Sequence, residues 1–387
     1  MRFCVNLRYN SRVKKILWAV QSLDRLGGTE TVSIRLMNLL CKDYEVTLVC
    51  SSEQEGETLY PLDPSIKVVP LHIDSKIGRF DQFWASYGWK HPFKRLALLQ
   101  KTINVYFWGR PKRQKYIAGL MDEDTVFIAS SLDSYRYAPR KNPGKVFFHY
   151  HFDAPSFEKD NFFLRGCRKP DHYVFLTEST LKEVCEKHPE FKEKSSFIYN
   201  PTKFAPQENY GPHGHEIIFV GRFTEQKDPL LALQIALELK KRGFPFHMKM
   251  YGDGHLAGDM HAFIEENGLE NEVEMISGES INASHYLASD MMLITSAYEG
   301  FSLVKFEANA CSLPVVTSRF SGPIDEVFHD GEDGYVVDSR DPKDYADRII
   351  GLLEDPKALE EAKRKAFLSS KRFSEESIVS EWKKILG

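Results

Sequence analysis

Two glutamates eight positions apart are the first residues whose types and spacing suggest chemistry. The stretch SAYEGFSLVKFEANA, residues 296–310, places Glu299 before a glycine and Glu307 within a helix-forming run. A helix that begins near Ser302 leaves its first amides without intrahelical partners, and such amides bind anions. Because helical side chains tilt toward the N-terminus, Glu307 can accept hydrogen bonds from hydroxyls beside that anion. The amides that we assign to the anion site belong to Gly300, Phe301, Ser302 and Leu303.

Three basic residues accompany these glutamates. Arg222 and Lys227 lie five positions apart in GRFTEQKDP, which follows the strand-like run EIIFV. A guanidinium fork and an ammonium point charge at one strand end suit a diphosphate. Lys305 lies among apolar helical neighbours, and we expect its alkyl chain to carry the ammonium out to solvent.

The elements around these residues predict an α/β protein with two domains. KKILWAVQSL, a glycine turn, TVSIRLMNLLCK and EVTLVCS form a strand–helix–strand unit, and a second alternation begins at residue 216. Residues 200–214 are rich in proline and glycine, which is typical of an interdomain linker. We predict two doubly wound Rossmann-like domains facing across a cleft, residues 1–205 and 206–387, with the last helix (about 374–387) packing back on the first. Ligands of such sheets bind at the carboxyl ends of the strands.

Composition and charge narrow the class of protein. Apolar residues make up 42% and charged residues 27% of the chain, as in globular proteins. Residues 1–205 contain 32 basic and 23 acidic side chains, whereas the remainder contains 19 and 32, so the halves differ in sign. The net charge of −4 argues against nonspecific nucleic-acid binding. The six scattered cysteines, and the lack of a signal peptide or a long apolar run, favour a cytoplasmic protein.

Taken in order, five motifs resemble the group 1 (family 4) retaining glycosyltransferases of the GT-B fold. The E-G-F-x-L…E spacing matches the signature of that family, and GGTE matches its glycine loop after the first strand. VGRFTEQKDP, GDGHL and PVVTSRFSGPIDEVFHDGEDGYVV match three further blocks. The resemblance covers essentially the whole chain, and it implies transfer of a sugar from a nucleotide-sugar donor to an acceptor.

The resemblance also implies roles for the charged residues. The family's equivalent of Glu307 holds the ribose hydroxyls of the nucleotide, and its equivalent of Glu299 lies near the transferred sugar. Amides at positions like 301–303 bind the diphosphate. Arg222 and Lys227 would then stabilise the leaving nucleotide as negative charge develops on it.

The resemblance extends to glycines and to one histidine. Gly27 and Gly28 would let a loop approach the phosphates closely, and Gly252 belongs to the turn that adjoins the donor. The family has a donor-contacting histidine after the strand that here reads KVFFHYHFD. His151 fits that role best, and His149 stays the alternative.

The expected reaction needs no metal ion and no cofactor. Retention by double displacement requires a carboxylate nucleophile, and none stands out at the strand ends of the N-terminal half. The family is generally thought to react on one face of the sugar, which keeps the α configuration. We expect a nucleotide-sugar donor, with a UDP-sugar favoured. We expect a glycan or lipid-linked acceptor, as in the biosynthesis of a surface polysaccharide or glycoconjugate.

Two other classes of function compete with this one. MYGDGHLA satisfies G-x-G-x-x-A after a strand, with Glu272 about twenty residues further on, as in nucleotide-dependent oxidoreductases. That motif does not open a domain, and it leaves Arg222, Glu299 and Glu307 unexplained. A noncatalytic sugar-binding relative would carry the same motifs, and turnover of a nucleotide sugar separates it from an enzyme.

Residues 82–121 are basic and aromatic. They contain eight Lys or Arg and no acidic residue, and apolar residues recur at helical spacing from residue 93. This pattern suits an anionic membrane surface, and equally a core helix with a solvated basic face. The expected membrane or acceptor contacts are Trp84, Lys94, Arg95, Trp108, Lys112, Arg113 and Lys115. They predict a cytoplasmic protein that docks on the cytoplasmic face of the membrane.

Overall fold

The computed structural model describes residues 13–21, 23, 27–52, 61–73, 100, 109–141, 143–151, 154–163, 169–299, 301–320 and 324–387. It divides into two compact units, Met1–Tyr199 with Val379–Gly387, and Asn200–Ile378. The boundary at Tyr199–Asn200 precedes the predicted one at residues 205–206. The reason is that the following residues bond to the second unit: Thr202 N donates to Phe373 O (2.9 Å) and Gln207 N to Ala310 O (2.7 Å).

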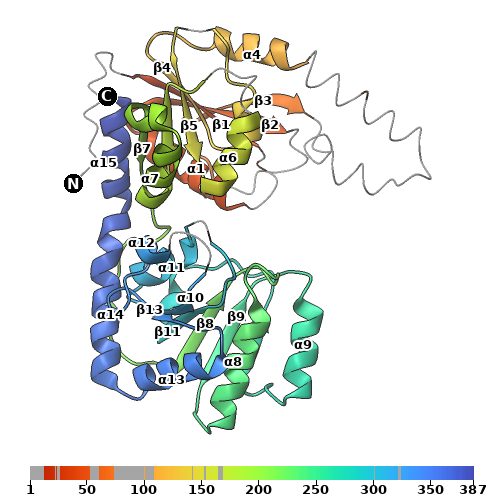
Figure 1. The fold of residues 1–387 in the computed structure, drawn as a ribbon, viewed down its shortest axis with the longest axis vertical. Helices are drawn as coiled ribbons and strands as arrows, with labels where there is room; N and C mark the ends of the chain where they lie inside the picture. The colour runs from red at the N-terminus through yellow and green to blue at the C-terminus, as the bar shows by residue number, and fades with distance from the viewer. Residues whose placement is uncertain are drawn as a thin grey trace. The chain divides into compact units, whose positions relative to one another are not determined.

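A seven-stranded parallel sheet forms the centre of the first unit, in the order β3-β2-β1-β4-β5-β6-β7 (Figure 1). Its middle strands are buried, as apolar strands covered by helices on both faces must be. Leu17 of β1 lies opposite Thr47 of β2 and Phe127 of β4. The strands are β1 (Lys15–Val20), β2 (Glu45–Ser52), β3 (Lys67–Ile73), β4 (Thr125–Ala129), β5 (Lys145–Tyr150), β6 (His172–Phe175) and β7 (Ser195–Phe197).

Short helices connect these strands, and two of them begin with a side-chain cap. Thr177 caps α7 by accepting from the Thr180 amide, and Ser131 caps α5 through a capping box. The helices are α1 (Gly28–Leu40), α4 (Arg110–Gly119), α5 (Leu132–Tyr135), α6 (Ala154–Phe163) and α7 (Glu178–Lys187). Within the described ranges, no helix has both the length and the apolar character needed to cross a bilayer.

The last helix, α15 (Glu375–Leu386), returns the chain to the first unit from Val379 onward. Trp382 is fully buried there, with its ring 5.3 Å from that of Trp18 and 5.1 Å from that of His149. Lys383 forms an ion pair with Asp43 at 2.7 Å. The C-terminal residues therefore supply part of the aromatic core of the first unit.

The second unit repeats the parallel plan with six strands, in the order β10-β9-β8-β11-β12-β13. The strand order reverses between β8 and β11, which makes that point a topological switch where α/β folds bind ligands. Its strands are β8 (Glu216–Val220), β9 (His247–Tyr251), β10 (Val273–Ile276), β11 (Met291–Ile294), β12 (Val315–Ser318) and β13 (Tyr335–Val337). Its helices are α8 (Pro229–Lys241), α9 (Ala257–Glu266), α10 (Ala283–Leu287), α11 (Leu303–Ala310), α12 (Ile324–Val327), α13 (Pro342–Leu353) and α14 (Pro356–Ser370). The predicted pair of Rossmann-like folds is confirmed.

A buried ion pair fixes the segment that we predicted to be a linker. Asp290 and Lys363 lie 3.1 Å apart with side chains 1% exposed, and Lys363 also donates to Gly211 O at 2.6 Å. Asp290 accepts from the amides of His213, His215 and Glu216. Residues 211–216 are therefore tied to the second unit, because buried charges require partners.

Candidate functional site

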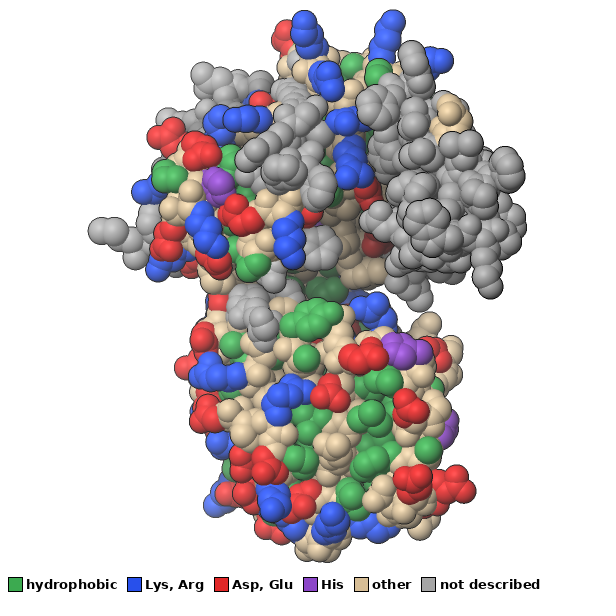
Figure 2. All heavy atoms as spheres, turned by 45° about the vertical axis from the view of Figure 1, so that its right-hand side comes forward, with side chains coloured by type: hydrophobic (Ala, Val, Ile, Leu, Met, Phe, Trp, Pro, Cys, Tyr) green, Lys and Arg blue, Asp and Glu red, His purple; other side chains and the backbone are tan. Residues whose placement is uncertain are grey.

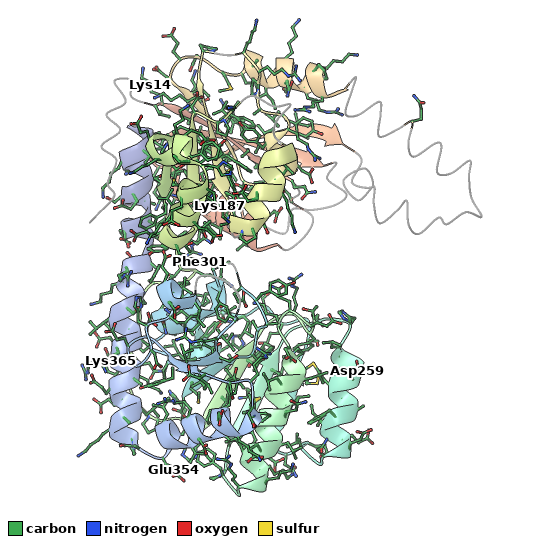
Figure 3. The ribbon with its side chains drawn as sticks, viewed as in Figure 1. Lys14, Lys187, Asp259, Phe301, Glu354 and Lys365 are labelled. Atoms are coloured by element: carbon green, nitrogen blue, oxygen red, sulfur yellow. The ribbon has the colours of Figure 1, made fainter. Side chains whose placement is uncertain are left out.

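The candidate site lies at the switch point of the second sheet, where the loops after β8 and β11 meet. The ammonium of Lys227, from the first loop, pairs with the carboxylate of Glu299, from the second. Ser296 Oγ donates to the same carboxylate oxygen at 2.7 Å, and Glu299 is only 8% exposed. Figure 3 labels Phe301 at this end of the second unit, and Glu354 at the opposite end. The fold thus joins two residues that lie 72 positions apart in the sequence.

Hydrogen bonds from the backbone and from side chains hold the loop after β8 in place. Asp228 adopts a left-handed conformation (φ 44°) and caps α8 by accepting from the Leu231 amide. Ala297 N donates to Gln226 O at 2.8 Å, which ties the loop after β11 to the loop after β8. Arg222 is exposed, and its Nη2 donates to Gln226 Oε1 at 2.9 Å. Two basic groups, Arg222 and Lys227, therefore belong to one short, well-bonded loop.

The glycines of the GDG turn have a structural explanation. A Cβ atom on Gly252 would lie 1.9 Å from the carbonyl oxygen of Gly221, and one on Gly254 would lie 2.2 Å from that of Phe223. Phe223 N also donates to Asp253 O at 2.8 Å. Both glycines are therefore needed so that this turn can pack against the loop that carries Arg222. The pattern that resembles a dinucleotide fingerprint is satisfied by packing alone.

Helix α11 begins beside Glu299, as predicted. Ser302 precedes it with φ 57° and makes no capping bond, so the first turn has no side-chain cap. Its buried Oγ has no hydrogen-bond partner among the described residues. Phe301 is buried and stacks on Phe306, with ring centroids 4.4 Å apart. An uncapped helix start next to cations can attract an anion. Gly300, also predicted for this site, lies outside the described residues.

Glu307 projects from the second turn of α11 and is half-buried. The hydroxyl of Tyr286 donates to its Oε2 at 2.8 Å. Burial and the charge of Glu307 together raise the pKa of the Cys311 thiol to about 12. The prediction that Glu307 is more than an exposed helix-surface glutamate agrees with this environment.

The expectation that Lys305 extends to solvent was wrong. Its side chain is fully buried, with Nζ 3.0 Å from Asp333 Oδ2 and 4.5 Å from the ring centre of Phe306. Burial lowers the pKa of Lys305 to about 8, while the charge of Asp333 opposes that shift. The ammonium is buried because the Asp333 carboxylate and the rings of Phe328 and Phe373, all distant in sequence, join Phe306 in replacing water around it.

Arg340 is a residue of the site that sequence analysis missed. Its guanidinium donates to Asp228 Oδ2 (2.7 Å), to the carbonyls of Thr295 (2.8 Å) and Ser296 (3.1 Å), and to Ser318 Oγ (3.2 Å). It thereby fastens together the ends of β11 and β12 and the start of α8. An arginine soon after a short strand gives no sequence signal for such a role.

The candidates of the first unit lie at the carboxyl ends of its strands. Gly27 and Gly28 begin α1, which follows β1. His151 and His149 contact each other at the end of β5, with Nε2 and Nδ1 3.1 Å apart. Burial lowers the pKa of His151 to about 3, and burial together with His151 lowers the pKa of His149 well below its ordinary value. Both imidazoles are therefore neutral at physiological pH.

The basic, aromatic stretch is described only in part. Trp84, Lys94, Arg95 and Trp108 lie outside the described residues. Lys112 and Lys115 are exposed on α4, whereas Arg113 Nε donates to the Leu71 carbonyl at 2.9 Å. Figure 2 shows Lys and Arg side chains projecting at the top of the first unit, where Figure 1 places α4. Among the residues that can be described, no three acidic, His or Cys groups are arranged to hold a metal ion.

Comparisons with known proteins match both the sequence and the fold. Residues 203–368 match the family model described as "Glycosyl transferases group 1". The amylovoran biosynthesis glycosyltransferase AmsD of Erwinia amylovora is 23% identical over 387 residues, which cover 96% of this chain and 99% of that protein. A D-inositol 3-phosphate glycosyltransferase of Paenarthrobacter aurescens is 31% identical over 170 residues, 42% of this chain and 41% of that protein. The predicted resemblance to the group 1 glycosyltransferases is confirmed, and the family match spans residues 203–368, most of the second unit.

Solved structures agree with the fold of this glycosyltransferase. S. aureus TarM, in a complex that contains UDP, superposes with a TM-score of 0.74 at 16% identity, covering 97% of this chain and 100% of that one. Anabaena HepE with UDP and glucose gives 0.67 at 15% identity, covering 96% and 99%. The predictions of the GT-B fold and of a transferase are confirmed. The family match contains Arg222, Lys227, Glu299 and Glu307.

Three buried histidines, His149, His151 and His172, make the stability of the first unit depend on pH, and burial lowers the pKa of His172 to about 4. In the unfolded chain each histidine has a pKa of about 6.5. In the folded state burial lowers the pKa of His151 to about 3. The contribution of these histidines to the free energy of unfolding should therefore be greatest above pH 6.5. It should fall as the pH drops toward 3, by at most about 1.4 kcal/mol per pH unit for each histidine. All five tryptophans lie in the first unit, so urea unfolding followed by tryptophan fluorescence measures it selectively.

The matched comparison uses His149→Gln/His151→Gln, with exposed His261→Gln on α9 as the control. The double variant should lose a large part of the difference between pH 7 and pH 5, with His172 supplying a further part, and the control should keep all of it. An unchanged difference in the double variant would contradict the assignment of this acid sensitivity to the pair.

Proposed function

We propose that this glycosyltransferase transfers a sugar from a UDP-sugar, with retention, to a glycan or lipid-linked acceptor in the biosynthesis of a surface polysaccharide or glycoconjugate. A relative from Campylobacter jejuni, 22% identical over 96% of this chain, is named as an N-acetyl-D-galactosaminyltransferase acting on a PP-undecaprenol-linked saccharide. AmsD is named for amylovoran biosynthesis, and the TarM and HepE complexes contain UDP. These names support the donor and the acceptor class proposed here.

One observation carries the proposal: Lys227, Glu299 and the uncapped start of α11 meet at the switch point of the second sheet. A nucleotide diphosphate needs positive potential, which Lys227, Arg222 and the α11 amides supply from two loops. Glu307, in the next turn of α11, can then accept hydrogen bonds from ribose hydroxyls. We therefore assign donor binding to the second unit.

The proposed reaction keeps the new bond on the face from which the nucleotide leaves. The bond between the anomeric carbon and the phosphate oxygen breaks, and the electron pair moves to the phosphate. The acceptor oxygen bonds to the anomeric carbon from the same side and gives its proton to the departing phosphate. Arg222 and Lys227 stabilise the charge that develops, and Glu299, next to the Lys227 ammonium, lies near the transferred sugar. Gly27, Gly28 and the neutral His151 are proposed as donor contacts from the first unit.

Glu307→Gln tests the nucleotide assignment. The variant should bind the donor about ten- to hundredfold more weakly, because a charge-assisted hydrogen bond contributes about 1.5–3 kcal/mol. Its melting temperature should stay close to that of the wild type, because the amide can still accept from Tyr286. Glu265→Gln, exposed on α9, is the matched control. Titration calorimetry with UDP measures the effect, and wild-type affinity in Glu307→Gln would remove this assignment.

Chelation tests the proposal that cationic side chains, not a metal ion, balance the diphosphate. Turnover of a UDP-sugar should survive dialysis against EDTA. Arg222→Ala should lower kcat by a factor that corresponds to about 2–4 kcal/mol, the usual loss for a preorganised charge contact. Arg364→Ala, on an exposed part of α14, controls for removal of an arginine. Loss of activity in EDTA, with recovery on adding Mg²⁺ or Mn²⁺, would refute metal independence.

We further propose that the first unit docks on an anionic membrane to meet its acceptor. The sequence of α4 has four basic residues and no acidic one. Lys112 and Lys115 are exposed near Tyr116 and Leu120, two apolar residues that are 54% and 37% exposed. Basic residues next to exposed apolar ones suit an interface of anionic headgroups. Arg113 contributes less, because its guanidinium bonds to the Leu71 carbonyl.

Vesicle co-sedimentation tests this docking. Each lysine near an anionic surface contributes about 1 kcal/mol, so Lys112→Glu/Lys115→Glu should reduce binding to phosphatidylserine vesicles at least tenfold. Lys241→Glu/Lys357→Glu makes the same charge change on exposed helix positions of the second unit and should bind normally. Binding should fall as salt rises. Equal sedimentation with neutral vesicles would contradict an electrostatic membrane contact.

A further inference from the structure

We infer that Tyr286 is a positioning residue, which holds the Glu307 carboxylate in the orientation that a ribose requires. This inference rests on the proposed role of Glu307 in binding the nucleotide. Tyr286 lies on α10, is fully buried, and donates from its hydroxyl to Glu307 Oε2 at 2.8 Å. It precedes Glu307 by 21 positions and has no place in the motifs of the sequence.

The direction of this hydrogen bond is fixed by chemistry. Burial raises the pKa of the Tyr286 hydroxyl well above its ordinary value, and the charge of Glu307 raises it further. The phenol therefore keeps its proton at neutral pH. A carboxylate can only accept, so Tyr286 is always the donor and Glu307 always the acceptor.

The tyrosine ring has little freedom to follow the carboxylate. It is enclosed on one side by Phe204, with centroids 5.7 Å apart and planes at 60°. Helix α10 is short, but its start is closed by Asn282, which accepts from Ser284 N at 2.9 Å. The adjacent His285 bonds to Glu279 Oε1 at 2.7 Å and packs edge-on against Tyr251. The hydroxyl is therefore a fixed point, and the flexible glutamate side chain is oriented against it.

This arrangement has a consequence for ligand binding. A glutamate on a helix surface samples several rotamers, and fixing it on binding costs conformational entropy. Tyr286 restricts the rotamers before the ligand arrives, and Oε2 retains a second lone pair for a ribose hydroxyl. The hydrogen bond thus prepares Glu307 for a vicinal diol, and its removal should weaken binding only of ligands that have those hydroxyls.

The test compares Tyr286→Phe with Glu307→Gln in the full chain. The probes are UDP and GDP, together with the 2′-deoxy and 3′-deoxy forms of each, measured by titration calorimetry. Tyr286→Phe should weaken binding of the better ribonucleotide about three- to tenfold, the loss expected for one neutral donor. The same substitution should have a much smaller effect on the affinity for the 2′-deoxy or the 3′-deoxy form of that nucleotide. Tyr335→Phe, which removes a hydroxyl from half-buried β13, should bind all probes as the wild type does.

The outcomes separate the inference from the function on which it rests. If Glu307→Gln weakens ribonucleotide binding but Tyr286→Phe does not, the positioning role is wrong and the proposed function stands. If Tyr286→Phe weakens all probes equally, the hydroxyl has only a structural role, and the inference also fails. If neither UDP nor GDP binds the wild type, or Glu307→Gln binds both normally, the proposed function itself fails.

Discussion

The arrangement of the candidate site depends on the ion pair between Lys227 and Glu299. Their side chains are 16% and 7% exposed, so either charge alone would lose most of its hydration without compensation. Each therefore requires the other, and this requirement brings together the loops that follow β8 and β11. Asp228, Arg340 and Ser296 extend the same set of charges and hydrogen bonds to the neighbouring strand ends. An anionic ligand that reaches Lys227 meets a cation already held in place, and must compete with Glu299 for it.

The polar groups at the carboxyl ends of the two sheets differ in charge. In the second unit, charged side chains gather at the switch point and are held by one another. In the first, His149 and His151 are buried as neutral rings in contact with each other, and His149 lies beside Trp18 and Trp382. A neutral imidazole can donate or accept a hydrogen bond without attracting a phosphate. The charged groups that could balance a diphosphate are therefore concentrated in the second unit.

Local patterns in the sequence were sufficient to predict many of the strands and helices, including those next to the candidate site, although β3, β7 and β13 were not predicted. Runs such as EIIFV and MMLITS are continuous and apolar, as buried parallel strands must be, and the spacing of Glu299 and Glu307 is local. Contacts between distant segments leave no such pattern. Lys305 could not be predicted as buried, because Asp333 and Phe373 meet it only in the folded chain. Arg340 contacts Asp228 across 112 positions, and Lys112 and Arg113 differ only because Leu71 is near one of them.

The return of residues Val379–Gly387 to the first unit has a consequence for how the chain folds during its synthesis. The second unit, Asn200–Ile378, is continuous and can complete its sheet as soon as it has left the ribosome. The first unit is translated earlier but lacks Trp382, so Trp18 and His149 keep an uncovered aromatic surface throughout the synthesis of the second. The part of the protein that is made first is therefore the last to close its core.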